Sequence, residues 1–367
     1  MRILITGGCG FIGSAAVRML VNADHQVLNI DKLTYAGDLR TVAAVASAPN
    51  YRFEKLDICD QPNIARSFSD FSPQAVLHLA AETHVDRSID DPTAFIDTNL
   101  RGTFVMLQAA LDYWQSLDAE GQARFRFIQV STDEVYGSLG DEGFFTEFTA
   151  YQPNSPYAAS KAGADHLARA WHSTFGLPTI ISNCSNNYGP FQNREKLIPT
   201  IIRKALSGQP IPIYGEGKNV RDWLYVDDHI AALLAACAQG RPGESYNIGG
   251  HCEINNLSLA HAICALLDQR QPRSDGRRHA DQIQFVTDRP GHDLRYAIDP
   301  GKAKSELGWR PHENLQTGLS RTVDWYLENP DWTLDAANSR DRLGLGASRK
   351  HPTRGSVTTG QEDGPEK

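Results

Sequence analysis

The sequence has few of the features that mark membrane, secreted or nucleic-acid-binding proteins. Its 367 residues include 36 basic and 44 acidic side chains, a net charge of −8, so no extended basic surface for nucleic acid is expected. The longest apolar run, residues 230–238, is far shorter than the ~20 residues that span a bilayer. We find no basic stretch followed by an apolar segment and a cleavage site, and expect a cytoplasmic protein with no membrane partner.

Cysteine is also scarce and scattered. The six cysteines form no Cys-x-x-Cys pair, which argues against a disulfide scaffold and against a zinc site. We therefore expect buried thiols in a reducing compartment and no metal. An apolar fraction of 41% is typical of a globular protein with a sizeable core.

Short apolar runs alternate with amphipathic stretches in the first half of the chain. Six runs are typical of buried parallel strands, at residues 2–5, 26–30, 51–56, 75–79, 125–130 and 179–181. Helical patterns lie between them, at residues 11–22, 92–114 and 156–175. Strand–helix alternation predicts an α/β fold with a doubly wound parallel sheet.

The pattern loosens after about residue 187, where Gly, Pro and Asn become frequent. Helical patterns recur at residues 197–206, 226–238, 257–267 and 315–327. We expect residues 1–187 to form a dinucleotide-binding domain to which later segments return. We expect residues 188–330 to form a smaller α/β substrate-binding region. Residues 347–367 have one large aliphatic side chain, Val357, and are predicted to be a disordered tail.

A glycine-rich turn follows the first predicted strand. Gly8, Gly10 and Gly13 fit G-x-G-x-x-G, and Gly7, Gly10 and Gly13 also give G-x-x-G-x-x-G. Glycines permit a tight turn and close approach of the backbone to a pyrophosphate, which the next helix N-terminus favours. Asp31 ends the second strand, 18 residues beyond Gly13, where a carboxylate accepts from both ribose hydroxyls of NAD and repels the 2′-phosphate of NADP. The alternative is a structural turn with a helix-capping Asp; the spacing favours a Rossmann-type NAD site.

Tyr157 and Lys161 form Tyr-x-x-x-Lys on a predicted helix, where positions i and i+4 share one face. A lysine ammonium beside a tyrosine favours the phenolate and lowers its pKa. The phenolate could then deprotonate a sugar hydroxyl while hydride leaves for NAD. Most such pairs are helix-surface neighbours, but the dinucleotide motif favours the catalytic interpretation.

Polar residues also follow the fifth predicted strand, in Ser131-Thr132-Asp133-Glu134. Ser131 or Thr132 could hydrogen-bond the reacting oxygen. Two adjacent carboxylates in a cleft push their pKa values apart, so one can act as an acid and the other as a base. The alternative is a loop with two solvated acids; the position at a strand end favours function.

These motifs resemble the extended short-chain dehydrogenase/reductase superfamily and, within it, the dTDP-glucose 4,6-dehydratase family. The Thr132-Asp133-Glu134 triplet separates that family from the 4-epimerases. Other resembling segments are residues 79–88, 183–190, 221–226, 246–250 and 288–293, so the resemblance spans residues 1 to about 330. One departure is Phe191-Gln192-Asn193-Arg194-Glu195-Lys196, where relatives commonly have Tyr-x-Phe-Pro-Glu-Lys.

The resemblance implies a reaction on dTDP-glucose. Tyr157 removes the proton of the sugar 4-hydroxyl while NAD takes the C4 hydride. Glu134 then removes the C5 proton, Asp133 protonates the departing 6-hydroxyl, and the hydride returns at C6. The product is the 4-keto-6-deoxy sugar nucleotide plus water, on the route to dTDP-rhamnose, and NAD is recycled. The alternatives are another nucleotide-sugar 4,6-dehydratase or 4-epimerase, or a non-catalytic NAD-binding protein.

The strand ends and the resemblance together give the expected site. The catalytic residues are Thr132, Asp133, Glu134, Tyr157 and Lys161. The cofactor contacts are Gly7, Gly10, Phe11, Ile12, Gly13, Asp31, Lys32, Leu33, Thr34, Asp57, Ile58, Leu79, Ala80, Ala81, Thr83, Thr98, Tyr157, Lys161 and Asn187. The substrate contacts are His84, Thr132, Asn186, Lys196, Leu197, Pro212, Ile213, Tyr214, Arg221, Asn256, Arg289 and His292. The resemblance also implies a homodimer that pairs through helices at residues 93–114 and 156–175.

Overall fold

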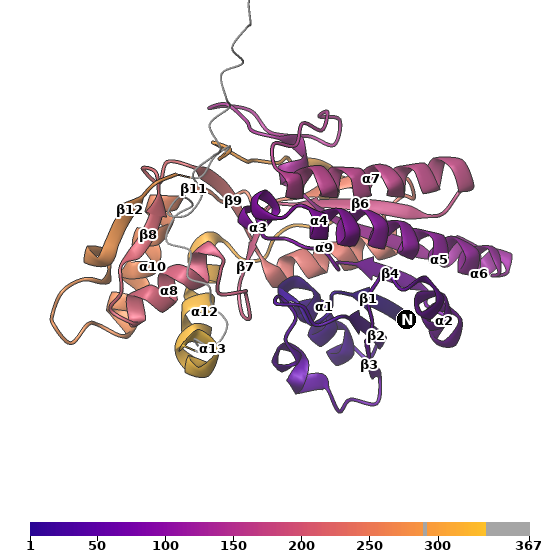
Figure 1. The fold of residues 1–367 in the computed structure, drawn as a ribbon, viewed down its shortest axis with the longest axis horizontal. Coiled ribbons are helices and arrows are strands. Elements are labelled where there is room, and N and C mark those ends of the chain that lie inside the picture. Colours follow the sequence, from indigo (N-terminus) through magenta and orange to yellow (C-terminus); the bar gives the residue numbers. More distant parts are fainter. Residues whose placement is uncertain (289–291, 335–367) are drawn as a thin grey trace, which may run out of the picture.

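A seven-stranded parallel sheet, in the order β10-β6-β5-β4-β1-β2-β3, is the centre of the larger lobe of the molecule (Figure 1). The computed structural model describes residues 1–288 and 292–334. The strands are β1 (Arg2–Thr6), β2 (Gln26–Asp31), β3 (Tyr51–Lys55), β4 (Ala75–His78), β5 (Arg126–Thr132), β6 (Thr179–Cys184) and β10 (Ser245–Ile248). Apart from the edge strand β3, these strands are buried along nearly their whole length, as a sheet covered on both faces requires.

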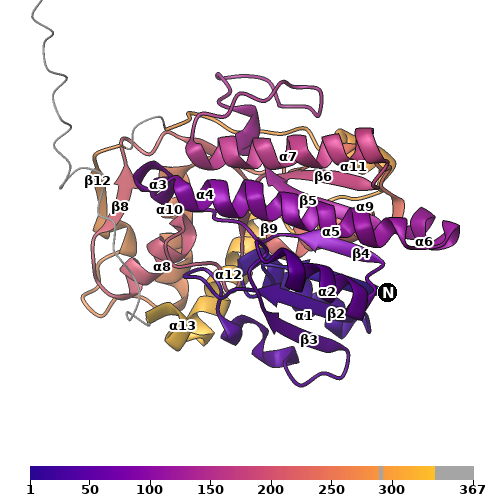
Figure 2. The same ribbon diagram turned by 45° about the vertical axis from the view of Figure 1, so that its right-hand side comes forward.

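Helices cover both faces of this sheet. One face packs against α1 (Phe11–Asn22), α9 (Val226–Gln239) and α11 (Gly301–Glu306), and the other against α2 (Gln61–Phe71), α5 (Thr103–Gln115) and α7 (Pro156–Phe175). Alternating strand residues separate the two cores: Ile3 and Ile5 lie in the first, and Leu4 lies in the second. Both views show α5 and α7 running side by side along the outside of the sheet (Figure 2).

The smaller lobe has a core of its own. A three-stranded sheet joins β11 (Glu253–Asn255), β9 (Val220–Tyr225) and β7 (Asn186–Tyr188), and a pair joins β12 (Ile283–Val286) and β8 (Ile211–Tyr214). These strands pack with α8 (Leu197–Leu206), α10 (Asn256–Arg270), α12 (Leu315–Glu328) and α13 (Pro330–Leu334). The sheet of the larger lobe points the carboxyl ends of its strands toward this lobe, so a crevice between the lobes is the expected ligand position.

The Rossmann-type fold predicted from the sequence is confirmed, and α1, α7 and α8 begin and end at the predicted residues. Strand β10 was missed because Ser245–Ile248 is short and half polar. The helix predicted at 92–114 is present at 93–115: α4 (Thr93–Phe95) continues through the π-helical stretch η2 (Ile96–Gly102) into α5. After residue 187, α9, β10 and α11 return to the large sheet. The tail at 347–367 lies outside the described residues.

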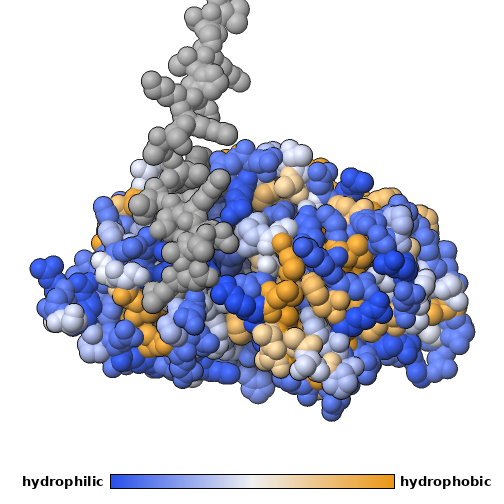
Figure 3. Space-filling view, turned by 60° about the horizontal axis from the view of Figure 1, so that its bottom comes forward, coloured by the Kyte–Doolittle hydropathy of each residue, from blue (hydrophilic) through white to orange (hydrophobic). Residues whose placement is uncertain are grey.

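The remaining short elements lie in the connections between these strands and helices. They are the 3-10 helices η1 (Leu39–Val45), η3 (Asp133–Tyr136) and η4 (His279–Gln282), and the helices α3 (Val85–Asp90) and α6 (Ala119–Arg124). Hydrophilic side chains cover most of the face in Figure 3, with a group of apolar ones near its middle. Among the described residues, no helix has the length and apolar character needed to cross a membrane.

Candidate active site

The glycine-rich turn lies between β1 and α1 and leaves room for a ligand against the backbone. Gly7 has a φ of +72°, and a Cβ there would lie 2.8 Å from the Cα of Ala80. A Cβ on Gly13 would lie 2.2 Å from the carbonyl oxygen of Gly7. Both separations are shorter than any real Cβ contact, so only glycine keeps strand, turn and helix this close. This cradle at the N-terminus of α1 fits the pyrophosphate of a dinucleotide.

Asp31 ends β2 beside this turn and is held by the main chain. Its Oδ2 accepts a hydrogen bond from the backbone N–H of Cys9 at 2.9 Å, and its Oδ1 accepts one from Leu33 at 2.8 Å. Burial raises the pKa of Asp31, while these N–H groups oppose the shift. A carboxylate has room for about four hydrogen bonds, so two remain for a ribose. The residues of this half therefore fit NAD.

A cavity of about 460 Å³ runs from the glycine turn into the smaller lobe. It brings together most of the expected residues: Gly7, Gly10, Phe11, Ile12, Gly13, Asp31, Lys32, Thr34, Ile58, Leu79, Ala80, Ala81, Thr83, His84, Thr98, Thr132, Asp133, Glu134, Tyr157, Lys161, Asn186, Asn187, Lys196, Leu197, Pro212, Tyr214, Arg221, Asn256 and His292. Most of the predicted residues thus share one continuous surface.

Four expected residues are not part of this lining. Leu33 donates its backbone N–H to Asp31, and Asp57 forms a salt bridge with Lys32 at 3.4 Å. Leu33 and Asp57 therefore contact residues that line the cavity but do not line it themselves. Ile213 is 1% exposed in the core of the smaller lobe, because alternation along β8 turns Pro212 and Tyr214 outward instead. Arg289 lies outside the described residues.

The acidic pair lies where β5 passes into η3. Thr132 caps this turn: its Oγ1 accepts from the backbone N–H of Glu134 at 3.3 Å and donates to Oδ1 of Asp133 at 3.3 Å. Asp133 is 2% exposed, and burial, together with the charges of Glu134 and Asp222, raises its pKa well above the usual range. The geometry therefore favours a protonated Asp133, as the sequence argument for two unlike carboxyls expected.

Ser131 and Thr132 were both candidates for the hydroxyl that meets the reacting oxygen. The structure separates them, because Ser131 Oγ donates to Oδ2 of Asp165 at 2.6 Å. Its proton is therefore engaged behind the site. Both residues line the cavity, but the hydrogen bond of Thr132 to Asp133 is longer, at 3.3 Å, and Thr132 also hydrogen-bonds Tyr157, so its hydroxyl is the better placed for substrate.

Tyr157 and Lys161 lie on the first turns of α7. Ser155 caps the helix by accepting from the backbone N–H of Ala158 at 3.0 Å. Lys161 is 6% exposed and donates from Nζ to the carbonyl oxygen of Val130 at 2.7 Å. The expected lowering of the Tyr157 pKa is not found: burial, followed by the charge of Glu134, raises it well above its ordinary value. The enclosed phenol and a nearby carboxylate outweigh the lysine, whose ammonium is engaged at Val130.

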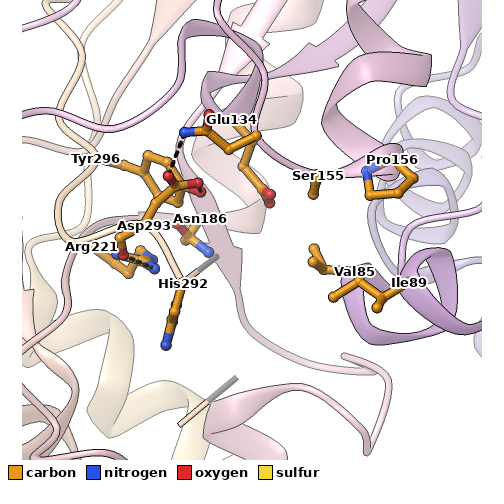
Figure 4. Close-up of a pocket in the computed structure, with 11 residues that line it drawn as sticks. Val85, Ile89, Glu134, Ser155, Pro156, Asn186, Arg221, His292, Asp293 and Tyr296 are labelled. Carbon is orange, nitrogen blue, oxygen red and sulfur yellow. Dashed lines mark hydrogen bonds between the residues drawn. The ribbon is translucent and has the colours of Figure 1, made fainter. Parts of the chain in front are cut away.

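A second cavity of about 300 Å³ adjoins the first and shares Glu134, Asn186, Arg221 and His292 with it (Figure 4). The guanidinium of Arg221 donates to the carbonyl oxygens of Val220 at 2.7 Å and Asp293 at 3.0 Å. It also lies 4.3 Å from the centre of the Tyr296 ring. This arginine is fixed before any ligand arrives, which suits recognition of a phosphate.

Comparisons with known proteins agree with this arrangement. A family model described as GDP-mannose 4,6 dehydratase matches residues 4–322. A probable dTDP-glucose 4,6-dehydratase of Sinorhizobium fredii is 55% identical over 348 residues, 94% of this chain and 99% of the relative. The dTDP-glucose 4,6-dehydratase of Salmonella typhimurium is 54% identical over 342 residues, 90% of this chain and 94% of the relative. The chain belongs to the dTDP-glucose 4,6-dehydratase family. The resemblance inferred from the sequence motifs is therefore confirmed.

A solved dTDP-glucose 4,6-dehydratase of Streptomyces venezuelae has the same fold. It superposes with a TM-score of 0.82 at 45% identity and covers 90% of this chain and 98% of its own. That protein was crystallised with NAD bound. A member of the dTDP-glucose 4,6-dehydratase family thus binds NAD, the cofactor that the glycine cradle of this chain fits.

Some residues of this site were missed by sequence reasoning. Glu195 lines the large cavity and joins the lobes: it pairs with Arg87 at 2.6 Å and with His84 at 3.0 Å. The Arg87 guanidinium also lies 3.6 Å from the centre of the Tyr35 ring, and Tyr35 lines the cavity as well. Glu195 and Arg87 are 108 residues apart, and no local pattern in this dehydratase sequence signals their contact.

Proposed function

We propose that this chain is a dTDP-glucose 4,6-dehydratase, an NAD-dependent hydro-lyase that forms dTDP-4-dehydro-6-deoxy-D-glucose and water. One observation carries the proposal: the buried Asp133 and its neighbour Glu134 share a cavity with Tyr157, between the glycine cradle and Arg221. An epimerase needs a base at C4 but no second acid–base pair for elimination. The family relatives support the same substrate.

Each group has a role that its surroundings allow. Tyr157 takes the proton of the 4-hydroxyl, and Thr132 would exchange its hydrogen bond to Asp133 for one to the same oxygen. Glu134 takes the C5 proton, which the new 4-ketone has acidified. Asp133 gives its proton to the departing 6-hydroxyl, so a water molecule leaves. When hydride reaches C6, Glu134 would return a proton to C5, and the proton held by Tyr157 would pass back to Asp133 before the next turnover. Bound NAD supplies a hydride acceptor at C4 and a hydride donor at C6.

The cavity walls make these proton transfers possible. Burial holds the proton on Asp133, and a neutral carboxylic acid is the form needed to protonate a leaving group. Lys161 would hold a hydroxyl of the cofactor ribose, and Asn187 would face the nicotinamide end of the cofactor. Asn186, Arg221 and His292 bind the sugar nucleotide, with Arg221 on the pyrophosphate.

The test is incubation of the purified protein with dTDP-glucose, without added NAD, followed by mass spectrometry of the sugar nucleotide. Loss of one water supports the dehydratase and shows that NAD is retained through purification. An unchanged mass with conversion to the galactose isomer by NMR would replace the proposal with a 4-epimerase. Absence of any change after NAD is added, with other nucleotide sugars also inert, would support a non-catalytic NAD-binding protein.

We also propose that the enzyme is a homodimer in the cytoplasm. Ile96, Phe104 and Phe175 are 49%, 41% and 44% exposed on the helices that the sequence resemblance pairs across the dimer. Phe104→Glu should place a charge in that interface and halve the mass measured by light scattering. The same change at Phe285, which is 55% exposed on β12 in the other lobe, should leave the mass unchanged. The six cysteines are unpaired, as in a reducing compartment.

A further inference from the structure

Asp165 is a buried carboxyl group that the reaction described above does not use. It lies on α7, one helical turn beyond Lys161, and is 0% exposed. Its Oδ2 accepts hydrogen bonds from Ser131 Oγ at 2.6 Å and from Tyr151 Oη at 3.2 Å. Ser131 directly precedes Thr132, so Asp165 is attached to the strand that carries the acid–base residues.

The groups around Lys161 identify its counter-charge. His78 on β4 faces it, but burial lowers the pKa of His78 to about 3, so this ring is neutral. Cys184 on β6 faces it too, but burial raises the pKa of its thiol to about 12. Tyr157 on the same helix is a neutral phenol at rest. Burial lowers the pKa of Lys161, and among these neighbours in the described part of the chain Asp165 is the group whose negative charge opposes that shift.

Neighbouring groups stabilise the ionised form of Asp165 against burial, although its pKa stays above its ordinary value. Burial raises its pKa, but Lys161, the Ser131 hydroxyl and Arg169 oppose that shift. Arg169 lies a further turn along α7, donates to Tyr151 Oη at 3.2 Å and stacks 4.9 Å from the centre of that ring. Tyr136 on η3 adds a neutral phenol nearby. One face of α7 thus presents a cation, an anion and a cation at successive turns.

We propose that Asp165 is a positioning residue that keeps the ammonium of Lys161 charged and fixed against the Val130 carbonyl while Tyr157 loses and regains its proton. An ammonium buried without a counter-charge sheds its proton, because burial disfavours the charged form. A neutral lysine could not stabilise the tyrosinate, whose formation is already opposed by burial and by Glu134. The inference rests on the proposed function, since it assigns Asp165 to the same C4 oxidation.

The decisive variant is Asp165→Asn, which keeps the size of the side chain and removes its charge. Loss of the anion should lower the pKa of Lys161, so the alkaline limb of the kcat profile should move to lower pH by about one unit or more. The KM for dTDP-glucose should stay near the wild-type value, because Asp165 does not line either cavity. A direct readout is NMR titration of isotope-labelled lysine, with the Lys161 signal assigned by its loss in Lys161→Arg.

A matched control is Asp228→Asn. Asp228 is also buried, at 4% exposure, accepts hydrogen bonds from the backbone N–H groups of His312 and Glu313 at 2.9 Å, and lines neither cavity. The Asp228→Asn protein should be less stable than the wild type and should keep the wild-type pH profile of kcat. Should Asp165→Asn fail to fold, Tyr151→Phe removes one hydrogen bond to Asp165 and should move the same limb in the same direction by less.

Two results would overturn the inference. One is an Asp165→Asn or Tyr151→Phe protein whose kcat falls equally at all pH values. The other is a Lys161 titration that does not move. Wild-type turnover of dTDP-glucose, measured in the same experiment, tests the proposed function separately, and the NMR titration of Lys161 needs no turnover.

Discussion

The two ends of the large cavity recognise their ligand in different ways. The cofactor end is built from backbone: Gly7 and Gly13 leave out side chains, and main-chain N–H groups fix Asp31. The end proposed to bind the sugar nucleotide is built from side chains such as Asn186, Arg221 and His292, which come from three distant segments. A backbone cradle tolerates no added atom, whereas a side-chain site can be adjusted one group at a time. The two ends should therefore fail differently when they are changed.

The acidic pair lies where the two ends meet, and changing it should have the largest effect. Asp133→Asn removes the acid while both binding ends stay intact. We expect kcat to fall by about a hundredfold to ten-thousandfold, as for loss of a general acid. Oxidation at C4 uses Tyr157 and should persist, so reduced nicotinamide should accumulate in a single turnover followed by its absorbance.

Asp141→Asn is the matched control for this variant, because Asp141 is an exposed carboxylate in the loop after η3. It should keep wild-type turnover. Full dehydration by Asp133→Asn would show that the leaving hydroxyl takes its proton from another group.

The cofactor end should respond next most strongly, and in an all-or-none manner. Gly13→Ala places a Cβ 2.2 Å from the Gly7 carbonyl oxygen, so the turn must move. We expect NAD to be lost during purification and the free energy of unfolding to fall by about 1–3 kcal/mol, as for overpacking. Denaturant unfolding and the cofactor content of the purified protein measure the two effects. Gly140→Ala, with nothing within 4 Å of the added Cβ, should change neither, and equal losses in both variants would contradict the steric argument.

The difference between the two ends also explains which parts of the site could be predicted from the sequence. The residues of the cofactor end lie close together in the sequence. The glycine spacing after one strand and the aspartate at the end of the next are therefore sufficient to predict this end of the site. The boundaries of α7 were also readable, because Ser155 caps it, Pro156 follows and Gly176 ends it in the left-handed conformation. Residues at the sugar-nucleotide end were named only through the family resemblance.

Other features depend on tertiary contacts and have no local signal. The salt bridge of Glu195 to Arg87 joins segments 108 residues apart. The short strand β10 is specified by its pairing with β6 rather than by its own composition. The raised pKa of Tyr157 depends on burial and on Glu134, whereas the spacing to Lys161 alone predicted a lowered one.

At the sugar-nucleotide end, single side chains should give graded effects. Arg221→Lys keeps the charge but loses the fork that donates to the Val220 and Asp293 carbonyls. We expect the KM for dTDP-glucose to rise about tenfold, equivalent to about 1.4 kcal/mol, with NAD retained. Steady-state kinetics and cofactor content measure both. The control is Arg241→Lys. Arg241 forms a surface salt bridge with Glu306, its side chain is 61% exposed, and its substitution should leave KM unchanged. Loss of NAD in Arg221→Lys would show that the two ends are not independent.

The smallest effect should come from the contact of Glu195 with His84 and Arg87, which joins the two ends of the cavity. Burial raises the pKa of Glu195, but hydrogen bonds from His84 and Arg87 outweigh it and lower the pKa from 4.5 to about 2. The carboxylate therefore stabilises the fold fully above its unfolded pKa, and this contribution is lost as pH falls through the window from about 4.5 to about 2. Glu195→Gln should lower the free energy of unfolding by about 1 kcal/mol at neutral pH, as for a partly screened ion pair.

Urea unfolding at several pH values measures this contribution. The difference between wild type and Glu195→Gln should shrink as the pH falls below about 4, because protonation removes the charge in the wild type as well. Glu120→Gln, which breaks a surface pair with a 69% exposed glutamate, should cost less at every pH. A Glu195→Gln difference that stays constant down to the acid transition would mean that its packing, rather than its charge, joins the cofactor end to the sugar-nucleotide end.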